Sequence, residues 1–245
     1  MLEARALVKS FGALRASDGI DFDVREGETH AVIGPNGAGK TTFISQLAGN
    51  LRPDAGTIRF AGEDITRLPA PKRARKGLAR SFQITSIYPE FTVLQNVALA
   101  VQARSGHSFR FWRPAHEDRS LVEPAAAVLE EVGLAGRMDV TAANLAHGEQ
   151  RQLEVAMALA TNPRLLLLDE PMAGMGAEES QRMIAFLAKL KGRQTMILVE
   201  HDMDAVFKLA DRISVLVYGR VIATGAPEQI RMNEEVRKAY LGEEA

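Results

Sequence analysis

The sequence contains no cysteine, a single tryptophan and no long uninterrupted hydrophobic run. Without cysteine the chain can form neither disulfide bonds nor thiolate metal sites. The N-terminal residues include Glu3, Arg5 and Lys9 where a signal peptide would need an apolar core, and no apolar run approaches the roughly 18 residues of a membrane span. We therefore expect a cytoplasmic protein that associates with a membrane only through another protein.

The sequence also lacks an excess of charge of either sign. It has 30 Lys and Arg against 31 Asp and Glu, and a formal net charge of -1. This balance removes the case for nucleic-acid binding through a basic surface, so we expect no nucleic-acid partner. A length of 245 residues with 46% hydrophobic residues fits one compact body with a secondary lobe. Partners must therefore be inferred from local sites.

The most informative segment follows the apolar run Ala31 to Ile33 and fits the phosphate-loop pattern G-x-x-x-x-G-K-[ST]. Glycines let the backbone turn tightly and direct its N–H groups inward, and a helix beginning near Lys40 adds partial positive charge at its N-terminus. The alternative is a glycine-rich turn with a lone surface lysine. The residues predicted to bind the nucleotide phosphates are Gly34, Pro35, Asn36, Gly37, Ala38, Gly39, Lys40, Thr41 and Thr42.

Two side chains in this segment have distinct predicted roles. Lys40 would reach the β- and γ-phosphates as a point charge. Thr41 would offer its hydroxyl to a bound Mg²⁺. The segment therefore predicts Mg²⁺ together with a nucleoside triphosphate.

Adjacent carboxylates follow a second buried strand, predicted over Arg164 to Leu168. Because side chains alternate along a strand, we expect Asp169 to hold the Mg²⁺ and Glu170 to face the space beyond the γ-phosphate. The alternative is a strand that ends in solvated acids. Another strand, Thr195 to Val199, leads to His201 at the same edge of the sheet, which favours a γ-phosphate sensor over a structural histidine.

A second glycine motif lies far along the chain, in the sequence LAHGEQR from Leu145 to Arg151. The amphipathic helix is predicted over Gln152 to Ala160, so that free N–H groups before it would form a second anion-binding end. An ordinary core helix that starts near a glycine is the alternative. The residues assigned to nucleotide contact here are Leu145, Ala146, His147, Gly148, Glu149 and Gln150.

The rest of the pattern predicts the frame around these motifs. Strands are expected at residues 2–8 and 20–24, and a hairpin at 213–217 and 221–224. Thr92 and Gln95 form a capping-box pattern ahead of a helix. The basic run 72–76 is interpreted as a solvated helix face, with a partner-docking patch as the alternative. Residues 105–119 lack periodicity and are predicted as a surface loop or short insertion.

With these residues identified, the whole chain resembles the ATP-binding subunit of ABC transporters, most closely that of branched-chain amino-acid importers. Gly34 to Thr42 resembles the Walker A motif, Leu165 to Asp169 the Walker B motif, and Leu145 to Arg151 the signature. Urea importers are similar over the same segments. The resemblance implies that Gln83 is the Q-loop glutamine, which contacts Mg²⁺. It also implies that Glu170, His201 and Gln83 are catalytic residues and that Phe11 is the aromatic that stacks on adenine.

The resemblance implies an α/β P-loop NTPase fold, with a parallel-sheet core lobe, a small antiparallel part and an inserted helical lobe. We expect the core lobe at about 1–83 and 163–226, the helical lobe at about 84–162 and a helical tail at about 227–245. The implied cofactors are ATP and Mg²⁺. The implied partners are a second ATP-binding subunit arranged head to tail, two integral-membrane permeases and, indirectly, a periplasmic solute-binding protein. The chain would lie at the cytoplasmic face of the inner membrane.

Two positions depart from the general family pattern. Ala146 replaces the signature serine, and Gly176 lies where an aspartate is usual. These departures favour pairing with a related but non-identical subunit. A soluble ABC protein with no transporter is the rival hypothesis, and a P-loop kinase or GTPase does not explain the LAHGEQR motif.

Overall fold

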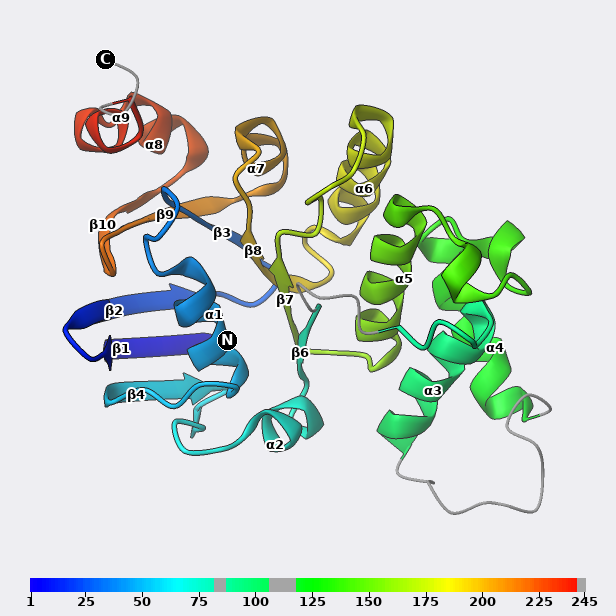
Figure 1. The fold of residues 1–245 in the computed structure, drawn as a ribbon. Helices are drawn as coiled ribbons and strands as arrows, with labels where there is room; N and C mark the ends of the chain where they lie inside the picture. The colour runs from blue at the N-terminus through cyan, green and yellow to red at the C-terminus, as the bar shows by residue number, and fades with distance from the viewer. Residues whose placement is uncertain (82–86, 106–117, 242–245) are drawn as a thin grey trace.

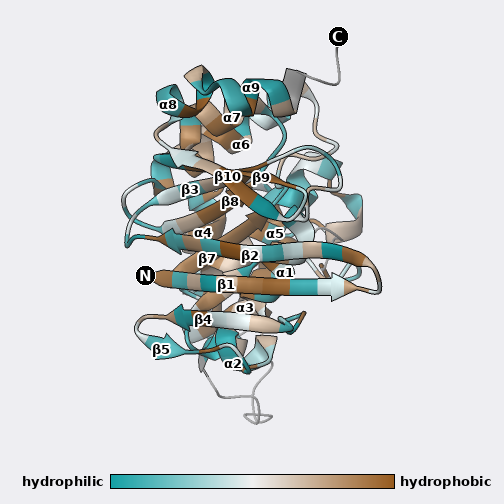
Figure 2. Ribbon diagram, turned by 90° about the vertical axis from the view of Figure 1, so that its left-hand side faces the viewer, coloured by the Kyte–Doolittle hydropathy of each residue, from teal (hydrophilic) through white to brown (hydrophobic). Residues whose placement is uncertain are grey.

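The computed structural model describes residues 1–81, 87–105 and 118–241, and it contains two β-sheets with helices packed around them (Figure 1). The first sheet is antiparallel, and its strands are longer than the sequence predicts. Its polar and hydrophobic residues alternate, so that one face is buried and the other faces solvent (Figure 2). Its order is β2 (Leu14–Val24), β1 (Leu2–Phe11), β4 (Ala55–Phe60) and β5 (Glu63–Asp64).

The second sheet has parallel strands except for its edge strand β10, which pairs with β9 as the predicted hairpin. The order is β10 (Arg220–Gly225), β9 (Arg212–Val217), β3 (Thr29–Ile33), β8 (Thr195–Val199), β7 (Leu165–Asp169) and β6 (Leu78–Arg80). Strands β3, β7 and β8 are buried along their whole length, as expected for parallel strands covered on both faces. The predicted α/β class with a small antiparallel part is confirmed.

The two faces of the parallel sheet pack against different layers. Leu165 and Leu167 of β7 belong to the hydrophobic cluster shared with α1 (Lys40–Ala48) and the antiparallel sheet. Leu166 and Leu168 belong to the cluster formed with α5 (His147–Ala160) and α6 (Ala177–Leu190). Because successive side chains of a strand point to opposite faces, α1 and α5 cover opposite faces of the sheet.

A group of helices packs beside the β6 edge of the sheet (Figure 1). It comprises α3 (Val93–Ser105), α4 (Arg119–Glu131) and α5, which contact one another. The predicted capping box of α3 is confirmed, because Thr92 N donates to Gln95 Oε1 at 2.9 Å and Gln95 N donates to Thr92 Oγ1 at 3.1 Å. The predicted loop 105–119 lies largely outside the described residues, as does Trp112.

The remaining helices are short. They are α2 (Ala70–Arg75), α7 (Met203–Leu209), α8 (Pro227–Met232) and α9 (Glu234–Leu241). The sequence analysis did not predict α7, although Asp202 caps it by accepting a hydrogen bond from Ala205 N at 3.1 Å. Among the described residues, no helix has both the length and the apolar composition to cross a membrane.

The prediction of a solvated basic face at residues 72–76 is wrong for one member. Arg73 is 1% exposed, and its guanidinium donates to the carbonyl oxygens of Gln46 and Leu47, both at 2.7 Å. These carbonyls belong to the last turn of α1, where Gln46 O otherwise accepts, in the described part of the chain, only from Gly49 N at 3.3 Å. Arg73 therefore caps the helix that follows the phosphate loop.

Candidate active site

The phosphate loop connects the carboxyl end of β3 to the first turn of α1, as predicted. Gly39 has a φ of 101°, and a Cβ at this position would lie 2.2 Å from the carbonyl oxygen of Ala16. Only glycine fits both the backbone conformation and this close approach. Helix α1 ends at Gly49, whose φ of 84° is the left-handed conformation common at glycine helix caps.

Lys40 lies inside the loop rather than in solvent. Its side chain is largely buried, and Nζ donates to the carbonyl oxygens of Gly34 at 2.6 Å and Pro35 at 3.1 Å. Burial lowers the pKa of Lys40, while the charges of Glu170 and Asp169 act in the opposite direction. Strands β3 and β7 both pair in parallel with β8, so their carboxyl ends bring Lys40 and the two carboxylates to the same side of the sheet.

Asp169 is the last residue of β7, and its side chain is 1% exposed. Its Oδ2 atom accepts a hydrogen bond from Arg80 Nη2 at 2.7 Å. Its Oδ1 atom is buried and has no hydrogen-bond partner among the described residues. A buried carboxylate oxygen without a partner is costly, so this atom is a good candidate ligand for a cation or a cation-bound water.

The residues present fit a magnesium ion bound together with a nucleotide. Thr41 supplies an exposed hydroxyl in the first turn of α1, and Asp169 supplies the unpartnered carboxylate oxygen. The described residues contain no cluster of His, Asp and Glu that could hold a metal by itself. Such a donor set suits Mg²⁺, which commonly takes one or two protein ligands and completes its shell with phosphate oxygens and water.

Glu170 directly follows β7 and turns away from the strand. Its φ is 51°, and its backbone N–H donates to Val199 O of the neighbouring strand at 2.9 Å. A left-handed non-glycine residue costs about 1–3 kcal/mol and is concentrated at functional sites. Asp169 and Glu170 are therefore separated by a backbone turn after the strand, rather than by the strand alternation that the sequence predicts.

His201 follows β8 and is exposed, whereas the adjacent Glu200 is buried. The Glu200 carboxylate accepts hydrogen bonds from Met172 N at 3.0 Å and from His201 N at 3.2 Å. Burial raises the pKa of Glu200, against the effect of these hydrogen bonds. Glu200 thus ties the segment after Glu170 to the segment that carries His201.

The signature motif begins its helix earlier than predicted. Helix α5 starts at His147 rather than at Gln152, which places Gly148 in the first turn and not before it. The first N–H groups of the helix have no acceptor within it, as the anion-binding prediction requires. The Glu149 carboxylate is already engaged, since it accepts from Ala146 N at 3.0 Å and from Arg137 Nε at 2.8 Å.

The structure does not bring all the predicted site residues together. The phosphate loop leads into α1 on one face of the parallel sheet, and the signature leads into α5 on the other. His147 instead contacts the segment after Glu170, where its Nε2 lies 3.3 Å from Ala173 O. The signature therefore lies across the parallel sheet from the phosphate loop of the same chain.

Phe11 lies at the end of β1 and is 49% exposed, so its ring is accessible for stacking. Lys9 Nζ lies 5.6 Å from the centroid of that ring and forms an ion pair with Asp54 at 2.6 Å. These contacts orient the aromatic side chain. The predicted Q-loop residue Gln83 lies outside the described residues.

Sequence reasoning missed Arg80 and Glu200 as members of this site. Arg80 has no motif around it, and only the pairing of β6 with β7 places it beside Asp169. Glu200 was visible as a charged residue at the end of an apolar strand, a position where a buried carboxylate is unusual.

Comparison with known proteins agrees with this geometry. Residues 17–173 match the family model described as ABC transporter, and residues 220–245 match that described as branched-chain amino acid ATP-binding cassette transporter. The high-affinity branched-chain amino acid transport ATP-binding protein BraF of Pseudomonas aeruginosa is 42% identical, with 99% of this chain and 98% of that protein covered. LivG of Escherichia coli, which has the same descriptive name, is 38% identical with the same coverage.

A solved structure of similar architecture is the ADP conformation of MJ1267, an ATP-binding cassette of an ABC transporter. It has a TM-score of 0.87 and 31% identity, with 99% of this chain and 98% of that chain covered. The similarity spans the whole chain, including the phosphate loop, the signature and the C-terminal helices. The chain therefore belongs to the ABC transporter family, as a nucleotide-binding ATPase subunit of the branch that contains BraF and LivG.

Proposed function

We propose that this chain hydrolyses ATP, with Mg²⁺, to drive uptake of branched-chain amino acids through separate membrane subunits. The observation that carries the hydrolytic part is the position of Lys40, Asp169 and Glu170 after the carboxyl ends of β3 and β7, which both pair in parallel with β8. The names of the similar proteins support the solute class. Urea or amide uptake is the nearest alternative, and a soluble ABC ATPase without a transporter is the other.

In the proposed reaction, Lys40 and the loop N–H groups hold the β- and γ-phosphates. Glu170 accepts a proton from the attacking water as its oxygen bonds to the γ-phosphorus and the bond to the ADP oxygen breaks. His201 contacts the γ-phosphate, and Phe11 stacks on the adenine. Thr41, Gln83 and Asp169 would hold the Mg²⁺, which supplies charge neutralisation to the phosphates when bound.

We further propose that two ATPase subunits close head to tail. The placement of α1 and α5 on opposite faces of the sheet supports this arrangement, because the residues from Leu145 to Gln150 then face a partner's ATP. Ala146 and Gly176 offer that ATP neither a hydroxyl nor a carboxylate. Loss of one preorganised donor typically costs ~10²–10³ in rate, so the proposed partner is a related chain with an intact signature.

The proposed pairing of this chain with a related, non-identical ATPase subunit, an unequal pair, can be tested in the assembled transporter. Glu170→Gln in this chain and the matching substitution in the partner are introduced separately, and ATPase activity is measured for each. We expect the larger loss from Glu170→Gln, because the site on this chain's phosphate loop faces the partner's intact signature. Equal losses would contradict the unequal pair.

A groove beside β6 supports docking of a membrane subunit. It encloses 380 Å³, and its lining is mostly apolar, with Ala70 and Ala74 from α2, Ala100 from α3 and Met157 from α5. We propose that a short amphipathic segment of a permease fills it, which would place the chain at the cytoplasmic face of the inner membrane.

Copurification and transport separate the hypotheses. Ala74 lines the groove and is exposed, so Ala74→Trp should reduce copurification with the permeases and leave ATP affinity intact. Ala188→Trp, at an exposed position on α6, is the matched control.

In proteoliposomes with the cognate binding protein, leucine rather than urea should stimulate ATP hydrolysis. Absence of any membrane partner would support the soluble alternative.

A further inference from the structure

Arg80 is a largely buried cation beside the predicted metal ligand, and neither the sequence motifs nor the proposed mechanism use it. It is the last residue of β6, and its side chain is 12% exposed. Its guanidinium spans two elements, since Nη2 donates to Asp169 Oδ2 at 2.7 Å and Nη1 donates to Ser45 Oγ of α1 at 3.3 Å. Arg80 therefore links the helix after the phosphate loop to the end of β7.

The contact between Arg80 and Asp169 leaves the two oxygens of the carboxylate in different bonding states. Oδ2 is held by Arg80, while Oδ1 is buried and has no partner among the described residues. A planar guanidinium fixes the orientation of a carboxylate better than a flexible ammonium group can. With Oδ2 held in this way, rotation of the carboxylate is restricted and Oδ1 keeps one position.

A purely structural ion pair would be expected to satisfy more of its own atoms. Taking two charges out of water is compensated only when the remaining lone pairs and protons also find partners. Here Asp169 Oδ1 and Arg80 Nε both stay without partners in the described part of the chain. The oxygen without a partner, Oδ1, belongs to the carboxylate that the site requires, as expected of a preorganised metal ligand.

We propose that Arg80 is a positioning residue that orients Asp169 so that Oδ1 receives Mg²⁺ or a water molecule bound to it. This inference rests on the proposed use of Mg²⁺ with ATP. The positive charge of Arg80 does not oppose the ligand, because the complex of Mg²⁺ with ATP has a net negative charge. Loss of groups that orient a metal ligand typically lowers metal affinity by ~10–100-fold.

The test measures the Mg²⁺ dependence of nucleotide binding, without using activity. Binding of a fluorescent ATP analogue is titrated with Mg²⁺ in the full-length chain, and the affinity for the analogue is also measured in EDTA. For Arg80→Met we expect the Mg²⁺ midpoint to rise by at least ~10-fold. The affinity in EDTA should change much less, because Lys40 and the loop hold the phosphates without the metal.

Two further variants separate orientation from charge and from folding. Arg80→Lys keeps the charge but replaces the planar guanidinium with a flexible ammonium group, so its midpoint should lie between those of the wild type and Arg80→Met. It also preserves the test if Arg80→Met fails to fold. Arg212→Lys alters a buried cation at the opposite edge of the sheet and should leave the midpoint unchanged.

A double-mutant cycle with Asp169→Asn provides the decisive comparison. If Arg80 acts through Asp169, Arg80→Met should add no further shift of the midpoint on the Asp169→Asn background. An unchanged or lowered Mg²⁺ midpoint in Arg80→Met, or an equal shift on both backgrounds, would overturn the positioning role of Arg80 without affecting the proposed use of Mg²⁺. A wild-type protein whose nucleotide affinity ignores Mg²⁺ would overturn the proposed cofactor as well.

Discussion

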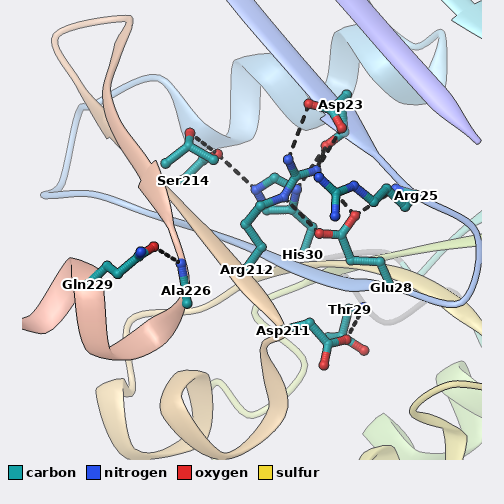
Figure 3. Close-up of polar contacts among 11 residues, drawn as sticks. Asp23, Arg25, Glu28, Thr29, His30, Asp211, Arg212, Ser214, Ala226 and Gln229 are labelled. Atoms are coloured by element: carbon teal, nitrogen blue, oxygen red, sulfur yellow. Dashed lines mark hydrogen bonds and ion pairs between the residues drawn. The ribbon is translucent and has the colours of Figure 1, made fainter.

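The parallel sheet has a largely buried arginine paired with carboxylates at each end of its strands, at the carboxyl edge and at the amino edge. The two pairs differ in how many hydrogen bonds their carboxylates make. At the carboxyl edge, Arg80 holds one oxygen of Asp169 and leaves the other without a partner in the described residues. At the amino edge, Arg212 donates Nε to Glu28 Oε1 and Nη2 to Asp23 Oδ2, both at 2.7 Å (Figure 3).

The network around Arg212 extends to the buried side chains of His30 and Ser214 and to the exposed Thr224. His30 lies with Nδ1 2.8 Å from Asp23 O and Nε2 2.8 Å from Ser214 Oγ (Figure 3). Ser214 Oγ itself lies 2.8 Å from Thr224 Oγ1. Both ring nitrogens are therefore satisfied. Beside this network the Thr29 hydroxyl is buried and has no partner among the described residues, so the contrast lies in the charged groups. Arg212 bonds two carboxylates, whereas Asp169 keeps one carboxylate oxygen available for a ligand.

The largest expected effect is at the carboxyl edge, where Glu170→Gln should lower turnover by ~10²–10⁴-fold, because the amide cannot accept the proton of the attacking water. ATP binding should persist and ATP-bound dimers should accumulate. Steady-state ATPase assays and calorimetric titration would measure the two properties. Near wild-type hydrolysis would contradict the assignment of Glu170 as the base. A large loss of thermal stability would show that Glu170 also stabilises the fold, as Arg212 is expected to do.

Arg212→Met should instead act on stability. It leaves Glu28, whose side chain is 8% exposed, without its cation, and an uncompensated buried charge costs about 3 kcal/mol of unfolding free energy. Urea denaturation would measure this loss, and nucleotide affinity should stay unchanged. Arg5→Met, at an exposed pair with a 3.9 Å separation, is the control and should change stability by less than about 0.5 kcal/mol. A weakened nucleotide affinity in Arg212→Met would contradict the conclusion that this network acts on stability alone.

Lys40→Ala should weaken nucleotide binding by about 1.5–3 kcal/mol, because it removes a charge-assisted contact to the phosphates. Calorimetry with ATP would measure the affinity, and Lys189→Ala, at an exposed position on α6, serves as the control. Unchanged affinity in Lys40→Ala would defeat the assignment of the phosphate loop.

The smallest expected effect is the pH dependence of the amino edge. Burial, assisted by the charge of Arg212 and opposed by those of Glu28 and Asp23, lowers the pKa of His30 to about 4. Its contribution to stability is therefore complete above the unfolded pKa of about 6.5, and it is lost as the pH falls toward the folded value. Between pH 6.5 and 5.5 the loss should be about 1 kcal/mol. His30→Gln should flatten this part of the denaturation profile, and an unchanged profile would contradict the titration of His30.

Local patterns were enough to predict much of the frame. The loop from Gly34 to Thr42, the capping pair Thr92 and Gln95 and the buried strands could be recognised because each depends on residues close together in the chain. The start of α5 was placed too late, because the polar residues after Gly148 resemble a loop until Glu149 is seen to cap the helix. The burial of Arg73 was missed for a similar reason, since its acceptors lie on another helix.

The sequence by itself therefore determined the phosphate-loop chemistry, most of the strands and helices along the chain, and the family resemblance. The tertiary structure decided which charged groups meet. Arg80 and Asp169 are 89 residues apart, and Arg212 and Asp23 are 189 apart. Sequence periodicity shows which face of a strand is buried but not which strand lies beside it, because strand order is set by how the helices pack across the sheet. For that reason the pairing of β6 with β7 and of β3 with β9 placed Arg80 and Arg212, and no motif could do so.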